Sequence, residues 1–240
     1  MVIEGFRDIL TILTVTFAGF AAITGLIVLN LLFHNRLKDL FDDAKYFILF
    51  SLVFGYILYA VGEVSFYLME VLSKNDSGGI ADVYWAGGAI FVVVAFLVVF
   101  YNLMKVAKDA SRFYVIGGVG VVLVGGVVYL VTQIIAPQGQ EISFFNYFYP
   151  FVGALIVTFG CSAFLFPKEL GSFSGPLRVF FLASLAIFIG DILFLYSLSE
   201  GSYLESSLGS ITDTFYCAGY GLSVLGFFQM YKHIHSAGKK

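Results

Sequence analysis

Seven long apolar runs organise this 240-residue sequence and leave few folds open to it. A hydrocarbon core about 30 Å thick requires about 20 apolar residues for each spanning helix. Inside lipid every backbone polar group must be satisfied internally, and runs of this length achieve that as helices, not as barrel strands. The sequence therefore predicts an all-α polytopic membrane protein, a single domain of seven transmembrane helices over residues 1–240. The predicted spans cover residues 8–33, 45–72, 82–106, 112–136, 146–166, 176–199 and 210–234.

Composition supports a bilayer as the solvent of this chain. Only 12% of its residues are charged and 60% are hydrophobic, whereas soluble domains carry about 25% charged residues. The first run has no basic leader and no small-residue cleavage motif, so we expect a true span and not a removed signal peptide. The predicted location is the cell membrane, with lipid as a partner and no nucleic acid.

The basic residues predict the orientation, because Lys and Arg concentrate on the cytoplasmic side. One side of the predicted bundle has only Arg7 and Lys74. The other side carries Arg36, Lys38, Lys45, Lys105, Lys108, Arg112, Lys168, Arg178, Lys232, Lys239 and Lys240. We expect the N-terminus outside and the C-terminus in the cytoplasm. Acids gather at the outer face, either as a mouth that attracts cations or because basic residues are excluded there.

The second predicted span carries a polar stripe. Tyr56, Tyr59, Glu63, Tyr67 and Glu70 recur at spacings of three and four and therefore share one helix face. An ionisable side chain in lipid costs about 2.5–3.5 kcal/mol, so this face must meet protein or a wet cavity. Two interpretations stay open for Glu63: a protonated acid bonded to a neighbouring helix, or part of a polar pocket open to the outside.

Residues 190–220 have a degraded copy at residues 62–88. Glu63 takes the place of Asp191, Asp82 that of Asp213, and Tyr84-Trp85 that of Phe215-Tyr216. Four spans separate the copies, which predicts a parallel 3+1+3 repeat: about 8–106, a linker helix at 112–136, and about 146–234. The site is expected where the copies meet, with Glu63 and Asp191 as candidates to face each other.

Two further features have structural explanations of their own. Asp82 and Asp213 each open a predicted span, and an acid at a helix N-terminus is favoured by about 1 kcal/mol through capping and the dipole. The linker helix is rich in glycine, which predicts a spacer or an axis on which other helices pack closely. Cys161 and Cys217 are predicted at different depths and do not form a disulfide.

The predicted ligand-binding residues are the acids and tyrosines of the two copies: Glu63, Asp82, Asp191, Asp213, Tyr59, Tyr203, Tyr216 and Tyr220. Their expected ligand is a small cation, an amine, or a lipid or hydrophobic molecule with a polar head. The sequence has no phosphate loop, nucleophile elbow or metal-spaced His/Cys cluster, so we predict no metal, no cofactor and no catalytic residue. The remaining hypothesis of an enzymatic function is a lipid hydrolase that uses Glu63 and Asp191 as general acid and base.

Residues 190–220 resemble the seven-helix N-terminal sensory region of bacterial diguanylate cyclases and related sensor proteins. The matching positions are Gly190, Asp191, Gly201, Tyr203, Asp213, Tyr216 and Tyr220, with a loop a few residues longer than in that family. The resemblance implies a sensory or ligand-binding membrane module. No cytoplasmic output domain follows the last span, so signalling is expected to need a separate cytoplasmic or membrane protein partner.

Three functions follow in order of preference. The first is a receptor-like binding module with an outward-facing acidic and aromatic pocket between the repeats. The second is a transporter of small solutes, or one coupled to cations or protons, since intramembrane acids suit such coupling. All four prolines are predicted near span ends, which argues against the broken helices of many carriers. The third is a structural subunit of a membrane complex.

Overall fold

The computed structural model describes residues 2–33, 40–72, 79–138, 143–201, 203 and 207–237, and in these ranges the chain is helical. The long helices are α1 (Val2–Phe33), α2 (Ala44–Phe66), α3 (Ile80–Val106), α4 (Ser111–Tyr129), α5 (Phe144–Gly160), α8 (Ser174–Ser199) and α9 (Ser207–Ala237). Two short helices, α6 (Ser162–Leu165) and α7 (Pro167–Leu170), lead from α5 towards α8. A π-helical segment extends α2 over Tyr67–Leu72, and another extends α4 over Leu130–Ile135. Each predicted span thus lies mainly on one long helix, and the span 146–166 also includes α6.

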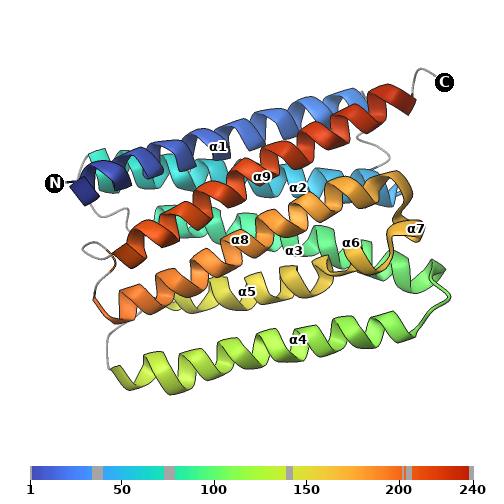
Figure 1. Cartoon of the computed structure of the whole chain (residues 1–240). Coiled ribbons are helices and arrows are strands. Elements are labelled where there is room, and N and C mark those ends of the chain that lie inside the picture. The colour runs from blue at the N-terminus through green and yellow to red at the C-terminus, as the bar shows by residue number, and fades with distance from the viewer. Residues whose placement is uncertain are drawn as a thin grey trace.

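Six segments, those that contain α1, α2, α3, α4, α5 and α8, are long and apolar enough to cross a membrane. This confirms a multi-pass, all-helical membrane protein in the described part of the chain. Helix α9 is not among the six, and its N-terminal half carries several Ser and Thr residues and Asp213. It nevertheless lies in the bundle beside α1 and α8 (Figure 1).

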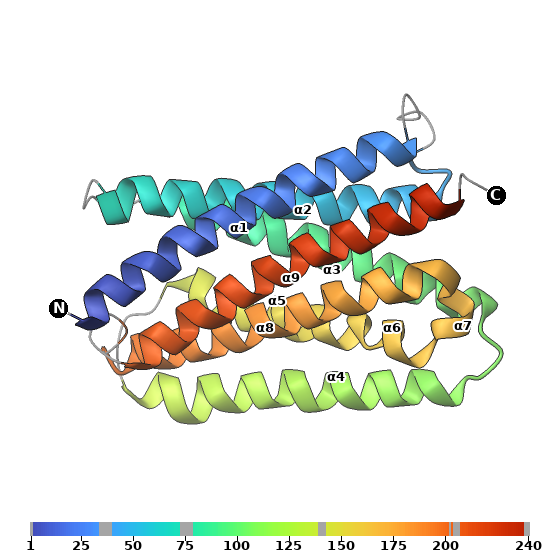
Figure 2. The same ribbon diagram turned by 45° about the horizontal axis from the view of Figure 1, so that its top comes forward.

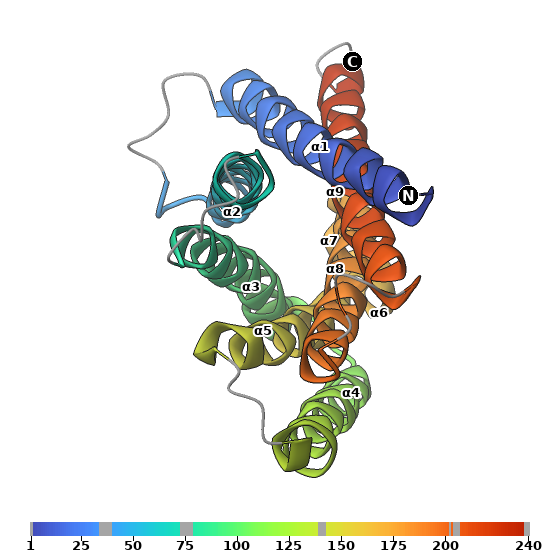
Figure 3. The same ribbon diagram turned by 90° about the vertical axis from the view of Figure 1, so that its left-hand side faces the viewer.

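Six of the long helices form a closed ring, and the seventh lies outside it. Each ring helix packs on two others, in the order α1, α2, α3, α5, α8, α9 and back to α1 (Figure 3). Helix α4 packs on α5 along the outer edge of the bundle (Figure 2). Successive long helices run in opposite directions, so the two termini lie at opposite ends (Figure 1).

The prediction that the glycine-rich helix is a packing axis is wrong. A Cβ atom added at Gly117, Gly118, Gly125 or Gly126 of α4 would meet nothing within 4 Å. Only Gly120 supports a close contact, since its Cβ would lie 2.9 Å from Thr158 of α5. Most glycines of α4 therefore face away from the ring, where small residues receive no neighbouring helix.

Close helix approach occurs instead between α2 and α3 and between α8 and α9. A Cβ on Gly88 of α3 would lie 2.9 Å from the carbonyl oxygen of Gly55 on α2. A Cβ on Gly219 of α9 would lie 3.1 Å from the carbonyl oxygen of Ala183 on α8. Without side chains at these crossings the backbones come into direct contact, as is usual where small residues pack transmembrane helices.

Helix α5 differs from its prediction in two ways. Pro150 lies buried inside the helix and not at its end, which removes one intrahelical hydrogen-bond donor. The helix also ends at Gly160, and the carbonyls that follow are bound by arginines. Arg112 donates to the Leu165 carbonyl at 2.6 Å, and Arg178 donates to the Ala163 carbonyl at 3.1 Å. These bonds satisfy carbonyl groups that a helix end leaves unpaired.

Candidate functional site

The six-helix ring encloses a cavity of about 810 Å³. Its walls come from α1, α2, α3, α5, α8 and α9, together with Gly201 and Tyr203 between the last two, and α4 contributes nothing among the described residues. Most lining residues belong to the N-terminal halves of α1, α3, α5 and α9 and the C-terminal halves of α2 and α8. Because successive helices alternate in direction, these halves share the end of the ring at which the chain begins (Figure 1).

All eight residues predicted to bind a ligand line this one cavity: Tyr59, Glu63, Asp82, Asp191, Tyr203, Asp213, Tyr216 and Tyr220. The structure thus brings the predicted residues of both sequence segments to a common space, and a role in binding stays a prediction. Sequence reasoning missed Asp8, Asn146 and Tyr149, which also line the cavity. A signal for two of them was present, since Asn146, Tyr149 and Gly153 recur at spacings of three and four on an otherwise apolar helix.

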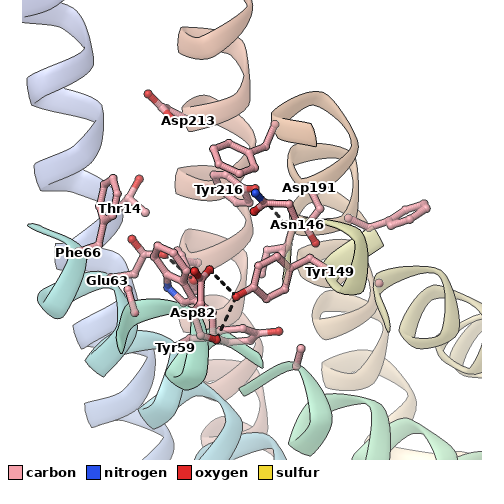
Figure 4. A pocket seen from close by; sticks show the side chains of 18 of the residues that line it. Thr14, Tyr59, Glu63, Phe66, Asp82, Asn146, Tyr149, Asp191, Asp213 and Tyr216 are labelled. Carbon is pink, nitrogen blue, oxygen red and sulfur yellow. Dashed lines mark hydrogen bonds between the residues drawn. The ribbon is translucent and has the colours of Figure 1, made fainter. Parts of the chain in front are cut away.

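Four tyrosine hydroxyls each donate a hydrogen bond to a different carboxyl of the cavity. The bond from Tyr149 to Asp82 can be followed in Figure 4. The pairs are Tyr220 with Glu63 (2.9 Å), Tyr216 with Asp191 (3.0 Å), Tyr203 with Asp213 (2.7 Å) and Tyr149 with Asp82 (2.9 Å). A buried polar group without a partner costs free energy, so these bonds explain how acids persist among apolar helices.

Two of these bonds connect the first three ring helices to the last three. Tyr220 on α9 reaches Glu63 on α2, and Tyr149 on α5 reaches Asp82 on α3. The hydroxyl of Tyr149 also donates to the backbone carbonyl of Asp82 at 3.0 Å. The two connections join different helix pairs, α2 with α9 and α3 with α5, so the carboxyls of α2 and α3 are both oriented by a helix of the other group.

A glycine precedes Glu63 and another precedes Asp191, and each allows an aromatic ring to lie directly against the backbone. A Cβ on Gly62 would lie 2.5 Å from Cδ1 of Trp85. A Cβ on Gly190 would lie 2.9 Å from Cε1 of Tyr216. Neither contact leaves room for a methyl group, so glycine at both positions places an aromatic side chain beside the following acid.

The polar groups of the cavity wall that have no hydrogen-bond partner among the described residues include the side chains of Tyr59 and Trp85. The Tyr59 side chain is only 6% exposed, and its hydroxyl makes no hydrogen bond there. The indole N–H of Trp85 is buried beside Glu63 but outside hydrogen-bonding geometry. Figure 4 shows Tyr59 low in the view, below Asp82 and Tyr149. Both groups are therefore available to a water molecule or to a ligand in the cavity.

The described residues that line the cavity include five acids and no Lys, Arg or His. The acids are Asp8, Glu63, Asp82, Asp191 and Asp213. They are too dispersed for a metal site, because no three of the described His, Cys, Asp and Glu side chains come together as ligands. The arrangement therefore favours cations over anions without the geometry to chelate an ion.

An aromatic cluster closes the ring beneath the cavity. Tyr56 of α2, Phe180 of α8 and Phe227 of α9 are each at most 1% exposed. Their ring centroids are 5.9 Å apart for Tyr56 and Phe180, 5.6 Å for Tyr56 and Phe227, and 4.7 Å for Phe180 and Phe227. Tilted and edge-on contacts at these separations are typical of packed aromatic cores. The cavity thus has a solid floor towards the end of the ring that holds the C-terminus.

We predicted that Asp82 and Asp213 each lie at a helix N-terminus, and the structure confirms this only for Asp82. Asp82 lies in the first turn of α3, behind an N-cap at Gly79. Asp213 does not open a helix, because α9 begins at Ser207 and has no acid in its first turn. Its carboxyl is only 8% exposed and lies in the cavity wall instead, so the capping explanation for Asp213 is wrong.

Several other predicted features can be placed. Both cysteines are free, as predicted. Tyr56 and Glu63 of the polar stripe are buried, and Tyr67 lies in the π-helical segment that follows α2. The side chain of Glu70 lies outside the described residues.

Comparisons of the chain with protein-family models, with curated protein sequences and with solved structures found no match. The resemblance of residues 190–220 to bacterial sensor regions therefore stays a prediction.

Proposed function

We propose that this protein is a receptor-like membrane module that admits a small molecule to the ring cavity from the outer face. The observation that carries the proposal is the convergence of six ring helices on one cavity of about 810 Å³. Ligand sites in proteins are commonly 300–1,000 Å³, mostly apolar, and hold a few convergent polar groups. This cavity has that character, with aromatic and aliphatic walls and five carboxyls.

The internal repeat supports a site between two related halves. The glycine–aromatic contacts correspond: Gly62 with Trp85 matches Gly190 with Tyr216. A second contact also corresponds, since a Cβ on Gly88 would meet Tyr59 at 2.8 Å and one on Gly219 would meet Ile187 at 2.6 Å. We therefore propose that α1–α3 and α5, α8 and α9 form parallel repeats, with α4 as the linker outside the ring.

The proposed orientation places the N-terminus outside and the C-terminus in the cytoplasm. The cavity lies at the N-terminal end of the ring, whereas Arg112 and Arg178 bind carbonyls near the end of α5 at the other. Since basic residues favour the cytoplasmic side, the acidic cavity would open to the exterior of the cell membrane. This agrees with the resemblance to sensor regions, and signalling would pass through a separate protein partner.

A transporter is the alternative function. The two proposed repeats are joined by two tyrosine–carboxyl hydrogen bonds, and alternating access would have the repeats rock against each other as these bonds break and re-form. The packed cluster of Tyr56, Phe180 and Phe227 favours the receptor-like module, because a carrier would have to separate three buried aromatic rings to open the floor.

The proposal can be tested by filling the cavity. Ala89 lies in the wall, one turn after Trp85 on α3, and is 5% exposed. The neighbouring Ile90 points away from the ring interior and is 48% exposed. Ala89→Phe would place an aromatic ring inside the cavity and reduce the space for a ligand, and Ile90→Phe is its matched control.

Purified wild type and both variants would be screened by thermal shift against small amines, alcohols, carboxylates and phospholipids. At least one compound should stabilise wild type and Ile90→Phe but not Ala89→Phe. The proposal fails if every stabilising compound acts equally on all three proteins while Ala89→Phe retains a cooperative unfolding transition.

A further inference from the structure

We infer that the ligand of the ring cavity is an organic cation: a protonated amine on an apolar, preferably aromatic, body that also carries a hydrogen-bond acceptor. The inference rests on the proposed binding function and names the chemistry that the cavity selects. It is carried by the size of the cavity, the distribution of its acids, its aromatic walls and the two donors left without a partner.

Glu63 and Asp191 are oriented by hydrogen bonds, and no basic side chain lies beside them among the described residues that line the cavity. Glu63 accepts a bond from Tyr220 at one oxygen, and Asp191 accepts one from Tyr216 at one oxygen. The second oxygen of each carboxyl has no hydrogen bond from a described residue. A carboxylate can accept about four hydrogen bonds, so one tyrosine leaves most of this capacity for an ammonium group.

Size and geometry distinguish an organic cation from a metal ion. A metal ion needs several ligands at bonding distance, and the described carboxyls do not gather in threes. A volume of about 810 Å³ is suited to a molecule of many heavy atoms. Figure 4 shows Glu63, Asp82 and Asp191 on the walls around the cavity, with Asp213 set apart in the upper part of the view.

The walls favour a cation with an apolar body. Aromatic rings of Tyr59, Phe66, Trp85, Phe194 and Tyr216 line the cavity. The face of such a ring attracts an ammonium group within about 6 Å and gains most when water is excluded. A polyamine would present little apolar surface to these walls, so a single amine on an aromatic or aliphatic body fits better.

Two hydrogen-bond donors without a partner indicate that the ligand also carries a hydrogen-bond acceptor. The Tyr59 hydroxyl and the Trp85 indole N–H both lie in the wall without a hydrogen-bond partner in the described structure. A ligand oxygen placed near them would satisfy one or both. An analogue that lacks such an oxygen leaves them unpaired, which protein sites reject when the donors are buried.

The test uses three probes of one shape and different charge. Tyramine carries an ammonium group and a phenol, tyrosol replaces the amine with a neutral hydroxyl, and 4-hydroxyphenylacetate carries a carboxylate. Binding to the purified full-length protein would be measured by calorimetry. Trp85 offers a second readout, because it is the only tryptophan of the chain and lies in the cavity wall.

Tyramine should bind at least about tenfold more tightly than tyrosol, and 4-hydroxyphenylacetate should bind most weakly, because the wall charges have one sign. Removal of the phenol oxygen, as in 2-phenylethylamine, should weaken binding about tenfold through the unpaired donors. Asp191→Asn and Glu63→Gln should each lower the affinity for tyramine about tenfold and leave the affinity for tyrosol unchanged. Glu169→Gln, an exposed acid at the other end of the bundle, should change nothing.

The inference is overturned if tyrosol binds as tightly as tyramine, or if both acid variants fold and bind tyramine like wild type. If neutral probes bind wild type as tightly as tyramine does but do not bind Ala89→Phe, the ligand is not a cation, and the proposed binding function still holds. If no probe binds, and no compound of the thermal-shift screen distinguishes Ala89→Phe from wild type, both the inference and the proposed function are overturned.

Discussion

The contact of Trp85 with Gly62 allows a sharp prediction, because a single methyl group would have to displace the indole. The Cβ of Gly62→Ala would lie 2.5 Å from Cδ1 and 2.7 Å from Nε1 of Trp85. Overpacking of this kind costs about 1–3 kcal/mol. Alanine in place of glycine within a helix gains about 0.8–1.0 kcal/mol. The net change in the free energy of unfolding should therefore be a loss of about 0–2 kcal/mol.

The matched control is Gly117→Ala on α4, where a new Cβ meets nothing within 4 Å. The gain in helix propensity is common to both variants, so their difference in stability reports the clash alone, about 1–3 kcal/mol. Both would be measured by denaturant unfolding in lipid nanodiscs. The fluorescence of Trp85, the only tryptophan of the chain, should shift in Gly62→Ala and stay unchanged in Gly117→Ala. Equal stability of the two variants with an unmoved Trp85 emission would refute the packing described for the site.

Three further predictions concern the hydrogen bonds and the thiols. Tyr220→Phe should lower stability by about 1 kcal/mol by leaving Glu63 unpaired, and the loss should shrink in a Glu63→Gln background; additive losses in the double-variant cycle would contradict the bond. Arg178→Ala should lower the unfolding midpoint through the loss of its bond to the Ala163 carbonyl, at a cost of about 1–2 kcal/mol, and an unchanged midpoint would show that this bond contributes nothing. Because both cysteines are free, a reducing agent should leave the mobility on denaturing gels and the thermal midpoint unchanged, and a shift in either would reveal a disulfide.

The helices were predictable because the thickness of a bilayer fixes the length of an apolar run. The boundaries shifted where local chemistry intervened. Helix α9 begins at Ser207, before its apolar run, and α5 ends at Gly160, within its apolar run. Hydropathy alone does not register the polar turn that starts a helix or the glycine at which one ends.

The place of α4 was not predictable from its glycines. Small residues allow a close neighbour but do not require one, and the sequence gives no sign of which helices become neighbours. Ring closure instead depends on contacts between distant segments, such as α1 with α9 and α3 with α5. The prediction that Asp213 caps a helix was wrong for a related reason. Asp213 lies in the cavity wall because of the way α9 packs on its neighbours, and the sequence does not show that packing.

The cavity residues were predictable to the extent that they share a helix face. Tyr56, Tyr59 and Glu63 follow one helical period, and a polar stripe in an apolar span has to face the protein interior. Tyr149 was missed because it lies among interfacial aromatics, and its partnership with Asp82 spans 67 residues. The spacing of Asn146, Tyr149 and Gly153 indicates a shared helix face, but nothing local in either segment indicates that Tyr149 and Asp82 are partners.

The two interpretations left open for Glu63 turn out not to exclude each other. Its carboxyl accepts a hydrogen bond from Tyr220 of another helix, as the first interpretation expects. It also lines the cavity, as the second interpretation expects. A purely structural acid would gain most from donors at both oxygens, because each unpaired buried acceptor costs free energy. Glu63 and Asp191 each have one tyrosine, although Trp85 lies beside Glu63 with an unused N–H. The incomplete pairing at corresponding positions of the two proposed repeats is what a carboxyl held ready for a ligand requires, since the tyrosine fixes its direction and leaves an oxygen open.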